Sequence, residues 1–242
     1  MDSLLSADEF VSKLRQIGAE NYHDKHPFQI RMHAGTLSKQ ELRGWLLNRF
    51  YYQQNIPIKD ALILSKLPTQ EDRRRWISRI VDHDGTTPSS GGIESWLSLG
   101  EAAGLSRQAM LSNDSVLPGV CFAVDAYVNF CRLEHWYPAV ASSLTELFAP
   151  DLVARRIEII EKHYPWVNPQ GLEYFRKRLE QAPRDADHAL ELVLKYGHDR
   201  TTQNQAFKAL TFKCEVLWSL LDGIEKAYSQ TDANNIQAEI SA

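Results

Sequence analysis

Residues 48–60, NRFYYQQNIPIKD, place charged and hydrogen-bonding side chains in a segment that otherwise has the pattern of a buried helix. At 3.6 residues per turn, Arg49, Tyr52, Gln53 and Ile56 share one helix face. Polar groups inside a protein cost free energy unless they find partners. The stripe is therefore either a satisfied network in the core or the wall of a pocket. By itself it favours the core network.

A histidine that could move protons stands in the segment DHDG at residues 82–85. The helix dipole at a C-terminus and the two flanking aspartates favour the protonated form of His83. Arg79 lies four residues earlier and shares its face. The segment is either a polar helix end or a general acid–base group beside a pocket, and in isolation it favours the helix end.

Two further segments carry groups that could bind or stabilise negative charge. Tyr174 and Arg178 are four residues apart, and a phenol beside a guanidinium can hold a carboxylate or a developing oxyanion. A surface cation with an aromatic neighbour explains the same spacing. Glu146 sits among apolar residues in SSLTELF, where it either turns inward or belongs to an amphipathic turn.

Asp185 and His188 have a spacing that metal ligands use on a helix. Di-iron helical bundles combine several Glu-x-x-His contributions, and the sequence has no repeated Glu-x-x-His. The spacing therefore favours structural hydrogen bonding over a metal site. Signatures of nucleophilic serine, zinc protease, Walker and Rossmann sites are absent from the sequence.

Composition is that of a globular protein and gives weak evidence for a small anionic ligand. The chain has 242 residues, of which 43% are hydrophobic and 24% charged. Its net charge of −4 does not favour nucleic acid or an anionic membrane, and it has no apolar run long enough to cross a membrane. Arginine outnumbers lysine 16 to 11, which is weak evidence for a carboxylate-bearing ligand because the planar guanidinium donates two parallel hydrogen bonds.

Cysteine use and the N-terminal segment indicate a cytoplasmic protein. Cys121, Cys131 and Cys214 are scattered and odd in number, so neither a disulfide framework nor a structural zinc site is expected. The first ten residues are acidic and do not resemble a secretory signal.

Helical periodicity and capping signals run through almost the whole chain, which we interpret as one helical domain, 1–242, with a frayed polar tail from about residue 230. We expect Pro57 to bend or interrupt a long helix that opens with a capping box at Ser38 and Glu41. The expected helices are Ser6–Glu20, a short helix after Pro27, Ser38–Ser65, a helix from Thr69 to Asp84, Ile93–Ala103, Pro118–Glu134, a short helix after Pro138, a helix from the Ala149-Pro150 break to His163, Asn168–Gln181, Arg184–Gly197 and Thr201–Tyr228.

Eight short segments, in one order between about residue 7 and residue 228, resemble the pyrroloquinoline quinone (PQQ) synthase family, PqqC. Several exact blocks in order are more specific than any single motif. The segments are NYHDKHPFQIRMH (21–33), NRFYYQQNIPIKDA (48–61), RIVDHDG (79–85), GGIESWL (91–97), FAVDAYVNF (122–130), SSLTELFAP (142–150), YFRKRL (174–179) and LTFKCEVLW (210–218).

The resemblance implies an all-α fold, a compact haem-oxygenase-like bundle of about seven main helices that usually forms a homodimer. It also implies an oxidase for the last step of PQQ biosynthesis, which uses O2 without a metal or a redox cofactor. Its substrate is a bicyclic precursor with several carboxylates. The enzyme closes the remaining ring and removes eight electrons, and oxygen leaves as hydrogen peroxide.

The resemblance also implies roles for particular residues of this chain. The oxygen and peroxide site would contain His83, a proton shuttle, together with Tyr174 and Arg178, which stabilise peroxide-like charge. The carboxylate-binding positions fall on Arg49, Arg79, Arg156, Arg178 and Lys213, and the other pocket positions on Tyr22, His23, Tyr52, Gln53, Tyr127 and Glu146. Some family members carry a histidine beside the oxygen site where this chain has Val153, so the polarity there is expected to differ.

Three alternatives stay open at the level of sequence. A metal-dependent oxidase on the same bundle would use Glu146, Asp185 and His188, although Gln181 is a poor ligand one turn before Asp185. A binding protein would sequester PQQ without turnover and would tolerate loss of His83. A thiaminase-like hydrolase would need a reactive cysteine in the pocket, and the segments around the three cysteines suggest none.

Overall fold

The structure is a computed structural model that describes residues 3–240, with side chains described for residues 3–229. Within that part of the chain every regular element is a helix, so the predicted all-α fold is confirmed. The α-helices are α1 (Ala7–Asn21), α2 (Pro27–His33), α3 (Lys39–Leu64), α4 (Gln70–Asp84), α5 (Gly91–Ala102), α6 (Arg107–Ser112), α7 (Pro118–Leu133), α8 (Trp136–Ser142), α9 (Ala149–His163), α10 (Glu173–Tyr196) and α11 (Arg200–Ile240). Three short 3-10 helices complete the set: η1 (His23–Lys25), η2 (Ser143–Phe148) and η3 (Pro169–Leu172).

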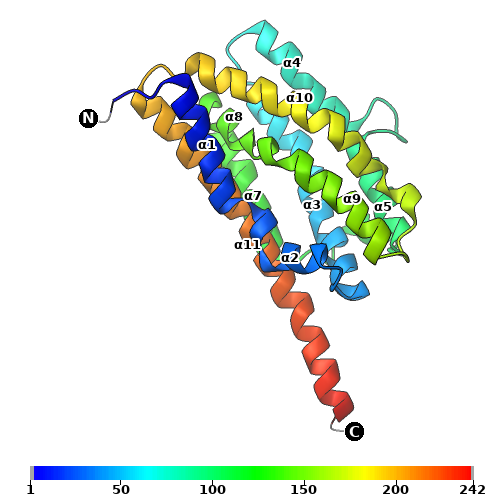
Figure 1. The fold of residues 1–242 in the computed structure, drawn as a ribbon. Helices are drawn as coiled ribbons and strands as arrows, with labels where there is room; N and C mark the ends of the chain where they lie inside the picture. Colours follow the sequence, from blue (N-terminus) through cyan, green and yellow to red (C-terminus); the bar gives the residue numbers. More distant parts are fainter. Residues whose placement is uncertain (1–2, 241–242) are drawn as a thin grey trace.

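The long helices pack side by side around one hydrophobic core (Figure 1). Helix α3 packs against α4, α5, α7 and α11, and α10 packs against α8, α9 and η2. Between residues 3 and 240, eight α-helices have twelve or more residues, one more than the seven main helices expected. Among the described helices, none is both long and apolar enough to cross a membrane.

Local capping chemistry explains why several helices begin and end where the sequence predicts. The Ser38 hydroxyl accepts from the Glu41 amide, and the Glu41 carboxylate accepts from the Ser38 amide, so the predicted capping box starts α3. Gly85 ends α4 with a φ of 78°, a conformation that a side chain disfavours. These two ends fix where the pocket-facing stripes of α3 and α4 lie.

Two prolines lie inside helices that continue through them. Pro57 does not interrupt α3, and Pro183 lies within α10, where we had expected one helix to end at Gln181 and another to begin at Arg184. An interior proline costs about 3 kcal/mol of helix stability. Tertiary packing offsets that cost because Ala182 and Ala186, on either side of Pro183, are buried against the rest of the bundle.

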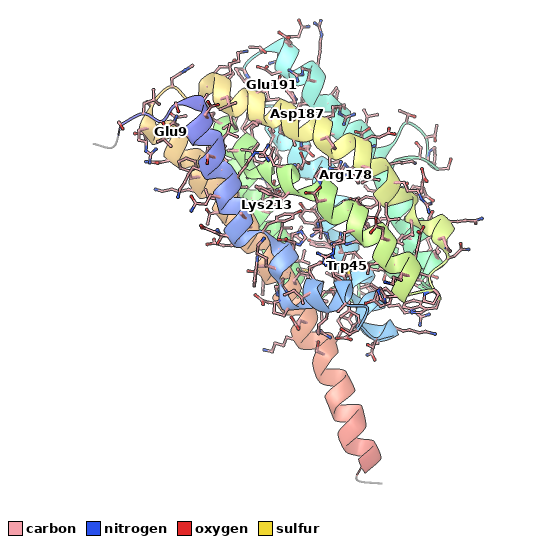
Figure 2. The ribbon with its side chains drawn as sticks, viewed as in Figure 1. Glu9, Trp45, Arg178, Asp187, Glu191 and Lys213 are labelled. Atoms are coloured by element: carbon pink, nitrogen blue, oxygen red, sulfur yellow. The ribbon has the colours of Figure 1, made fainter. Side chains whose placement is uncertain are left out.

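Helix α10 is strongly amphipathic, and this orients its functional residues. Arg178 is buried on its inner face, whereas Asp187 and Glu191 are exposed on its outer face (Figure 2). Helix α11 continues to Ile240 past residue 230, where the sequence suggests a frayed tail, and the side chains of that segment lie outside the described set. The sequence analysis missed α6, which Ser106 caps by accepting from the Ala109 amide.

An aromatic cluster between α3, α5 and α10 holds one wall of the interior in place. The Trp96 indole donates to the Leu46 carbonyl at 2.9 Å, and its ring packs edge-on against Trp45 and Tyr174 at centroid distances of 5.4 and 4.8 Å. Trp96 is 1% exposed. Trp96 therefore holds the Tyr174 ring in position relative to α3, through its ring contact and its hydrogen bond to Leu46.

We predict that Trp96→Ala destabilises the fold by about 3–5 kcal/mol, because it leaves a cavity and removes a buried hydrogen bond. Urea unfolding at a fixed protein concentration measures the change. Phe122→Ala is the matched control: this ring is 74% exposed, so we expect a change within about 0.5 kcal/mol. Equal losses in both variants would contradict the structural role assigned to Trp96.

Candidate active site

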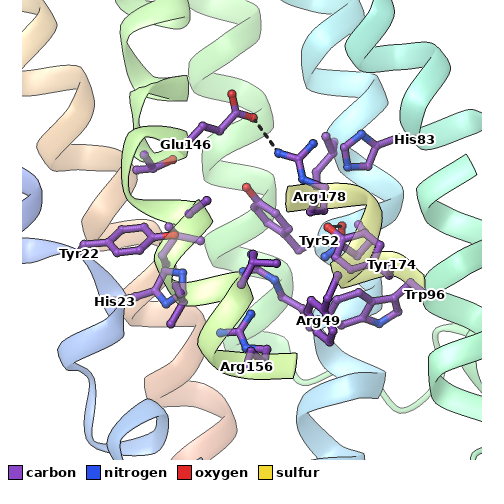
Figure 3. Close-up of a pocket in the computed structure, with 18 residues that line it drawn as sticks. Tyr22, His23, Arg49, Tyr52, His83, Trp96, Glu146, Arg156, Tyr174 and Arg178 are labelled. Carbon is purple, nitrogen blue, oxygen red and sulfur yellow. Dashed lines mark hydrogen bonds and ion pairs between the residues drawn. The ribbon is translucent and has the colours of Figure 1, made fainter. Parts of the chain in front are cut away.

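One cavity of about 100 Å³ in the middle of the bundle collects most of the predicted site residues (Figure 3). Ten of the thirteen line it, and they come from the α1–η1 junction, α3, α4, η2, α9 and α10. They are Tyr22, His23, Arg49, Tyr52, Gln53, His83, Glu146, Arg156, Tyr174 and Arg178.

The stripe on α3 is the wall of this cavity. Arg49, Tyr52, Gln53 and Ile56 all line it, so the interpretation as a closed core network was wrong. The Arg49 guanidinium lies over the Tyr52 ring, 4.0 Å from its centroid. The Gln53 carbonyl oxygen accepts from the Tyr174 hydroxyl at 2.9 Å. The stripe is thus partly satisfied by its neighbours and partly open to a ligand.

The other three predicted residues, Arg79, Tyr127 and Lys213, lie behind the lining. The Lys213 ammonium donates to the Tyr52 hydroxyl at 2.8 Å and sits 3.4 Å from the centroid of the Tyr127 ring. The Tyr127 hydroxyl is 3.3 Å from the Ser142 hydroxyl. These groups support the wall rather than form its surface in this structure.

Several lining residues were not singled out as site residues in the sequence. Val153 does line the cavity, as its place after the FAP segment suggests. Trp96 and Phe175 lie within segments that carry the family resemblance. Neither side chain is ionisable, so neither was proposed as a site residue. The other lining residues without an assigned role are Thr145, Ala149, Leu152 and Leu217.

Two arginines at the cavity have no carboxylate partner among the described residues. Arg156 is 7% exposed, donates to the Gln29 amide oxygen at 2.9 Å, and leaves its Nε without a partner. Burial, aided by the positive charge of Arg49, lowers the pKa of Arg156 to about 10. A buried guanidinium without a counter-charge is costly. Arg49 and Arg156 therefore form a ready site for an anion.

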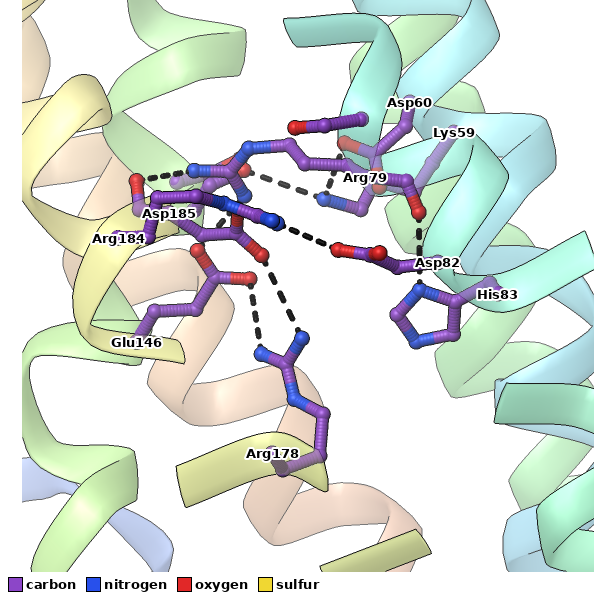
Figure 4. Close-up of polar contacts among 12 residues, drawn as sticks. Lys59, Asp60, Arg79, Asp82, His83, Glu146, Arg178, Arg184 and Asp185 are labelled. Carbon is purple, nitrogen blue, oxygen red and sulfur yellow. Dashed lines mark hydrogen bonds and ion pairs between the residues drawn. The ribbon is translucent and has the colours of Figure 1, made fainter. Parts of the chain in front are cut away.

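The carboxylates of the site are already bound by other arginines (Figure 4). Arg79 donates to Glu146 at 2.6 Å, and Arg178 lies 3.6 Å from the other oxygen of Glu146 and 3.4 Å from Asp185. Burial alone would lower the pKa of Arg178, but Glu146 and Asp185 raise it above its usual value. Arg178 thus stays charged at the cavity wall.

Asp185 serves as an anchor for arginines. Its carboxylate accepts from Arg178 and from Arg184, the latter at 2.7 and 3.1 Å, and its backbone carbonyl accepts from Arg79. His188 packs instead against Trp76, with ring centroids 5.9 Å apart. Across the part of the chain that the structure describes, no three His, Cys, Asp or Glu side chains are grouped as metal ligands would be.

His83 presents an unprotonated ring nitrogen to the cavity. Its Nδ1 lies 3.1 Å from the Arg79 carbonyl, which can only accept, so Nδ1 carries the hydrogen. Its Nε2 is buried and has no partner among the described residues. Burial and the charge of Arg178 lower the pKa of His83 to about 4. The expectation that its protonated form is favoured was wrong, because these two effects outweigh the helix dipole and the aspartates.

His23 is held neutral in the same way. Burial first, and then Arg49 and Arg156, set its pKa well below the usual value. Its ring packs against that of Tyr22 at 4.4 Å, and its Nδ1 has no partner among the described residues. The cavity therefore has an uncharged imidazole in its lining from η1 as well as one from α4.

The thiols lie elsewhere. Cys131 and Cys214 are buried and Cys121 is half-buried, and the lining of the cavity contains none of the three. Burial raises the pKa of the Cys214 thiol to about 12, which opposes formation of a thiolate. A cysteine nucleophile, as a thiaminase-like hydrolase would need, is not positioned at this site.

Comparisons of the sequence identify its relatives. The model of the TENA/THI-4/PQQC family matches residues 11–223. A protein of Cronobacter sakazakii named pyrroloquinoline-quinone synthase is 51% identical over 226 residues, which are 93% of this chain and 90% of that protein. A protein of Pseudomonas aeruginosa with the same name is 51% identical over 220 residues, covering 91% and 88% of the two chains.

Solved structures with low sequence identity share the fold. A protein from Shewanella denitrificans described as having a haem-oxygenase-like fold matches with a TM-score of 0.77 and 13% identity, over 95% of this chain and 96% of that chain. A TenA homologue from P. horikoshii matches with a TM-score of 0.70 and 12% identity, over 90% and 98%. The predicted haem-oxygenase-like bundle is thus confirmed, and with the matched residues and relatives above, the chain belongs to the TENA/THI-4/PQQC family.

Proposed function

We propose that this protein is a pyrroloquinoline-quinone synthase that carries out the last step of PQQ biosynthesis. It would close the remaining ring of a bicyclic polycarboxylate and oxidise it with O2, without a cofactor, to PQQ and hydrogen peroxide. One observation carries the proposal: the same cavity holds two guanidiniums and a histidine ring nitrogen for which the described residues supply no carboxylate and no hydrogen-bond partner, respectively. The relatives at 51% identity bear the same activity in their names.

Arg49 and Arg156 would bind the substrate carboxylates, because each lacks a carboxylate partner among the described residues. Charge-assisted pairs between guanidinium and carboxylate are strong and directional. Lys213 would act through Tyr52: its side-chain nitrogen donates to the Tyr52 oxygen, which leaves the Tyr52 hydroxyl hydrogen free for the ligand. The substrate would thus be oriented before any proton moves.

His83 would remove a proton from the substrate through Nε2 and deliver it to reduced oxygen. A neutral imidazole is the form that accepts a proton, and its low pKa keeps His83 neutral in the free enzyme. A bound polyanion opposes the effect of Arg178 and raises that pKa toward the working range. Each reduction of O2 to peroxide takes two electrons from the substrate and two protons. Arg178 and Tyr174, both at the cavity wall, would stabilise the negative charge on reduced oxygen.

We extend the proposal to the state of the protein in the cell: a single-domain homodimer in the cytoplasm. The scattered, reduced cysteines fit that compartment. Sedimentation at several protein concentrations tests the homodimer.

A single-turnover reaction tests the proposed activity. Protein stripped of metal is loaded with the bicyclic precursor without oxygen, oxygen is admitted, and the product is identified by its mass. We expect PQQ and peroxide, because the residues assigned here require no other reagent. Binding without product, rescued by iron, would support a metal-dependent oxidase. Binding with no product and no rescue would support a protein that only sequesters its ligand.

We predict that His83→Ala stalls oxidation while the affinity for PQQ changes by less than about tenfold, or about 1.4 kcal/mol. Binding energy comes from the arginines, whereas His83 moves protons. Equilibrium titration and single-turnover rates measure the two effects. His198→Ala, at an exposed histidine, is the control and should keep its rate. A large loss of affinity with normal turnover at saturation would refute the proton-shuttle role.

The pKa of His83 also predicts how stability depends on pH. Its folded value of about 4 lies below the value of about 6.5 expected when unfolded. The unfolded state thus binds more protons between these values, and stability falls as pH drops through this window. The wild type should lose up to about 1.4 kcal/mol more per pH unit than His83→Gln does. Urea unfolding at several pH values measures both slopes; equal slopes would show that His83 titrates normally.

A further inference from the structure

A second cavity, of about 310 Å³, lies directly outside the first. The C-terminal half of α1, η1, the end of η2 and the start of α9 enclose it. Tyr22 and Leu152 line both cavities. At these two residues the wall between the cavities is therefore one side chain thick.

On two elements, residues one or two positions apart line different cavities. On α9, Arg156 lines the inner cavity and Arg155 lines the outer one; at η1, His23 lines the inner cavity and Lys25 the outer. Neighbouring residues of an α-helix point about 100° apart, which explains why Arg155 and Arg156 line different cavities. Each cavity thus has one arginine of α9 in its lining.

The outer cavity has an excess of positive charge. Arg15 and Arg155 have no carboxylate within ion-pair distance among the described residues, whereas Asp24 is paired with Lys25 at 2.8 Å. Three cations then stand against Asp24 and Asp151, a net charge of +1. Positive charge at a concave surface attracts anions and speeds their association. The chemistry of the outer cavity therefore resembles that of the inner one, in a weaker and more exposed form.

Phe148 lines the outer cavity beside Tyr22, and its ring is held by packing. Its ring lies 5.5 Å from that of Tyr22 and rests on α1 at Gly18, where a Cβ would overlap the Phe148 ring. Phe148 is also the first residue before α9, and no side chain caps this helix start. A segment with few buried hydrogen bonds opens at low free-energy cost. Displacement of the Phe148 ring therefore breaks packing contacts but no side-chain hydrogen bond.

We propose that the outer cavity is an entrance subsite, which binds the carboxylates of the substrate before Phe148 and Tyr22 part and by which the product leaves. The inference rests on the proposed function, because it takes a polycarboxylate as the ligand. Arg155 and Arg15 hold the ligand first, and Arg156 and Arg49 receive its carboxylates on the other side of the wall. The ligand exchanges one set of arginines for another and is never left without counter-charge.

Stopped-flow binding of PQQ tests this subsite. The rates kon and koff are followed by tryptophan fluorescence, since Trp96 lines the inner cavity. Arg15→Gln/Arg155→Gln should lower kon about fivefold or more at low salt, with the deficit disappearing near about 1 M salt, where charges are screened beyond about 3 Å. Arg74→Gln/Arg132→Gln removes the same charge from exposed positions elsewhere and should change kon less than twofold. Equal kon values for the two double variants would overturn the proposal.

Phe148→Ala tests the wall itself. Removing the ring should raise kon and koff together by several-fold, so that their ratio, Kd, changes much less than either rate. A change confined to koff would mean that Phe148 only contacts the bound ligand and would overturn its role at the entrance. Failure of the wild type to bind PQQ would refute the proposed function, whereas normal wild-type binding with unchanged variants refutes the entrance subsite alone.

Discussion

The division of carboxylates among arginines is the constraint on which the site depends. Glu146 lines the cavity, Asp185 shares Arg178 with it, and Arg79, Arg178 and Arg184 bind these two carboxylates. Arg156 and Arg49 are left with charge that no described carboxylate neutralises. An unpaired buried charge costs folding stability, and that cost is offset only when an anion binds. Relief of this cost would therefore contribute to the affinity of the protein for a polycarboxylate.

The same excess of positive charge sets the protonation of the neighbouring bases. Burial and nearby arginines lower the pKa values of His83 and His23, and burial, Arg49 and Lys59 lower that of Lys213. Each of these groups would otherwise add to the charge that the free protein must bear. An arriving anion reverses the effect and makes each of them a better proton acceptor. Ligand binding and readiness for proton transfer are therefore coupled through one electrostatic field.

Signals that act within a turn or two of helix were readable in the sequence, whereas those that depend on distant packing were not. The capping box at Ser38 and the stop at Gly85 are local, and the structure has both. The continuity of α10 through Pro183 depends on packing against neighbouring helices. The local sequence does not contain that information, and it therefore predicts two helices separated at Pro183. The lowered pKa of His83 depends first on its burial and then on Arg178, from an element almost a hundred residues away. Family resemblance supplied the membership of the site, but not which members would form its surface.

Lys213 shows how a residue behind the wall can still shape the site. Its side-chain nitrogen is buried beside the rings of Tyr52 and Tyr127 and donates to the Tyr52 oxygen. A hydroxyl that accepts such a bond becomes a stronger donor, because hydrogen bonds in a chain polarise one another. Tyr52 lines the cavity, so Lys213 acts on a ligand through the hydrogen bond that the Tyr52 hydroxyl can donate. Placing Lys213 behind Tyr52 leaves direct ion pairing to Arg49 and Arg156. The position of the ligand would then be fixed by the arginines and its orientation by the tyrosine.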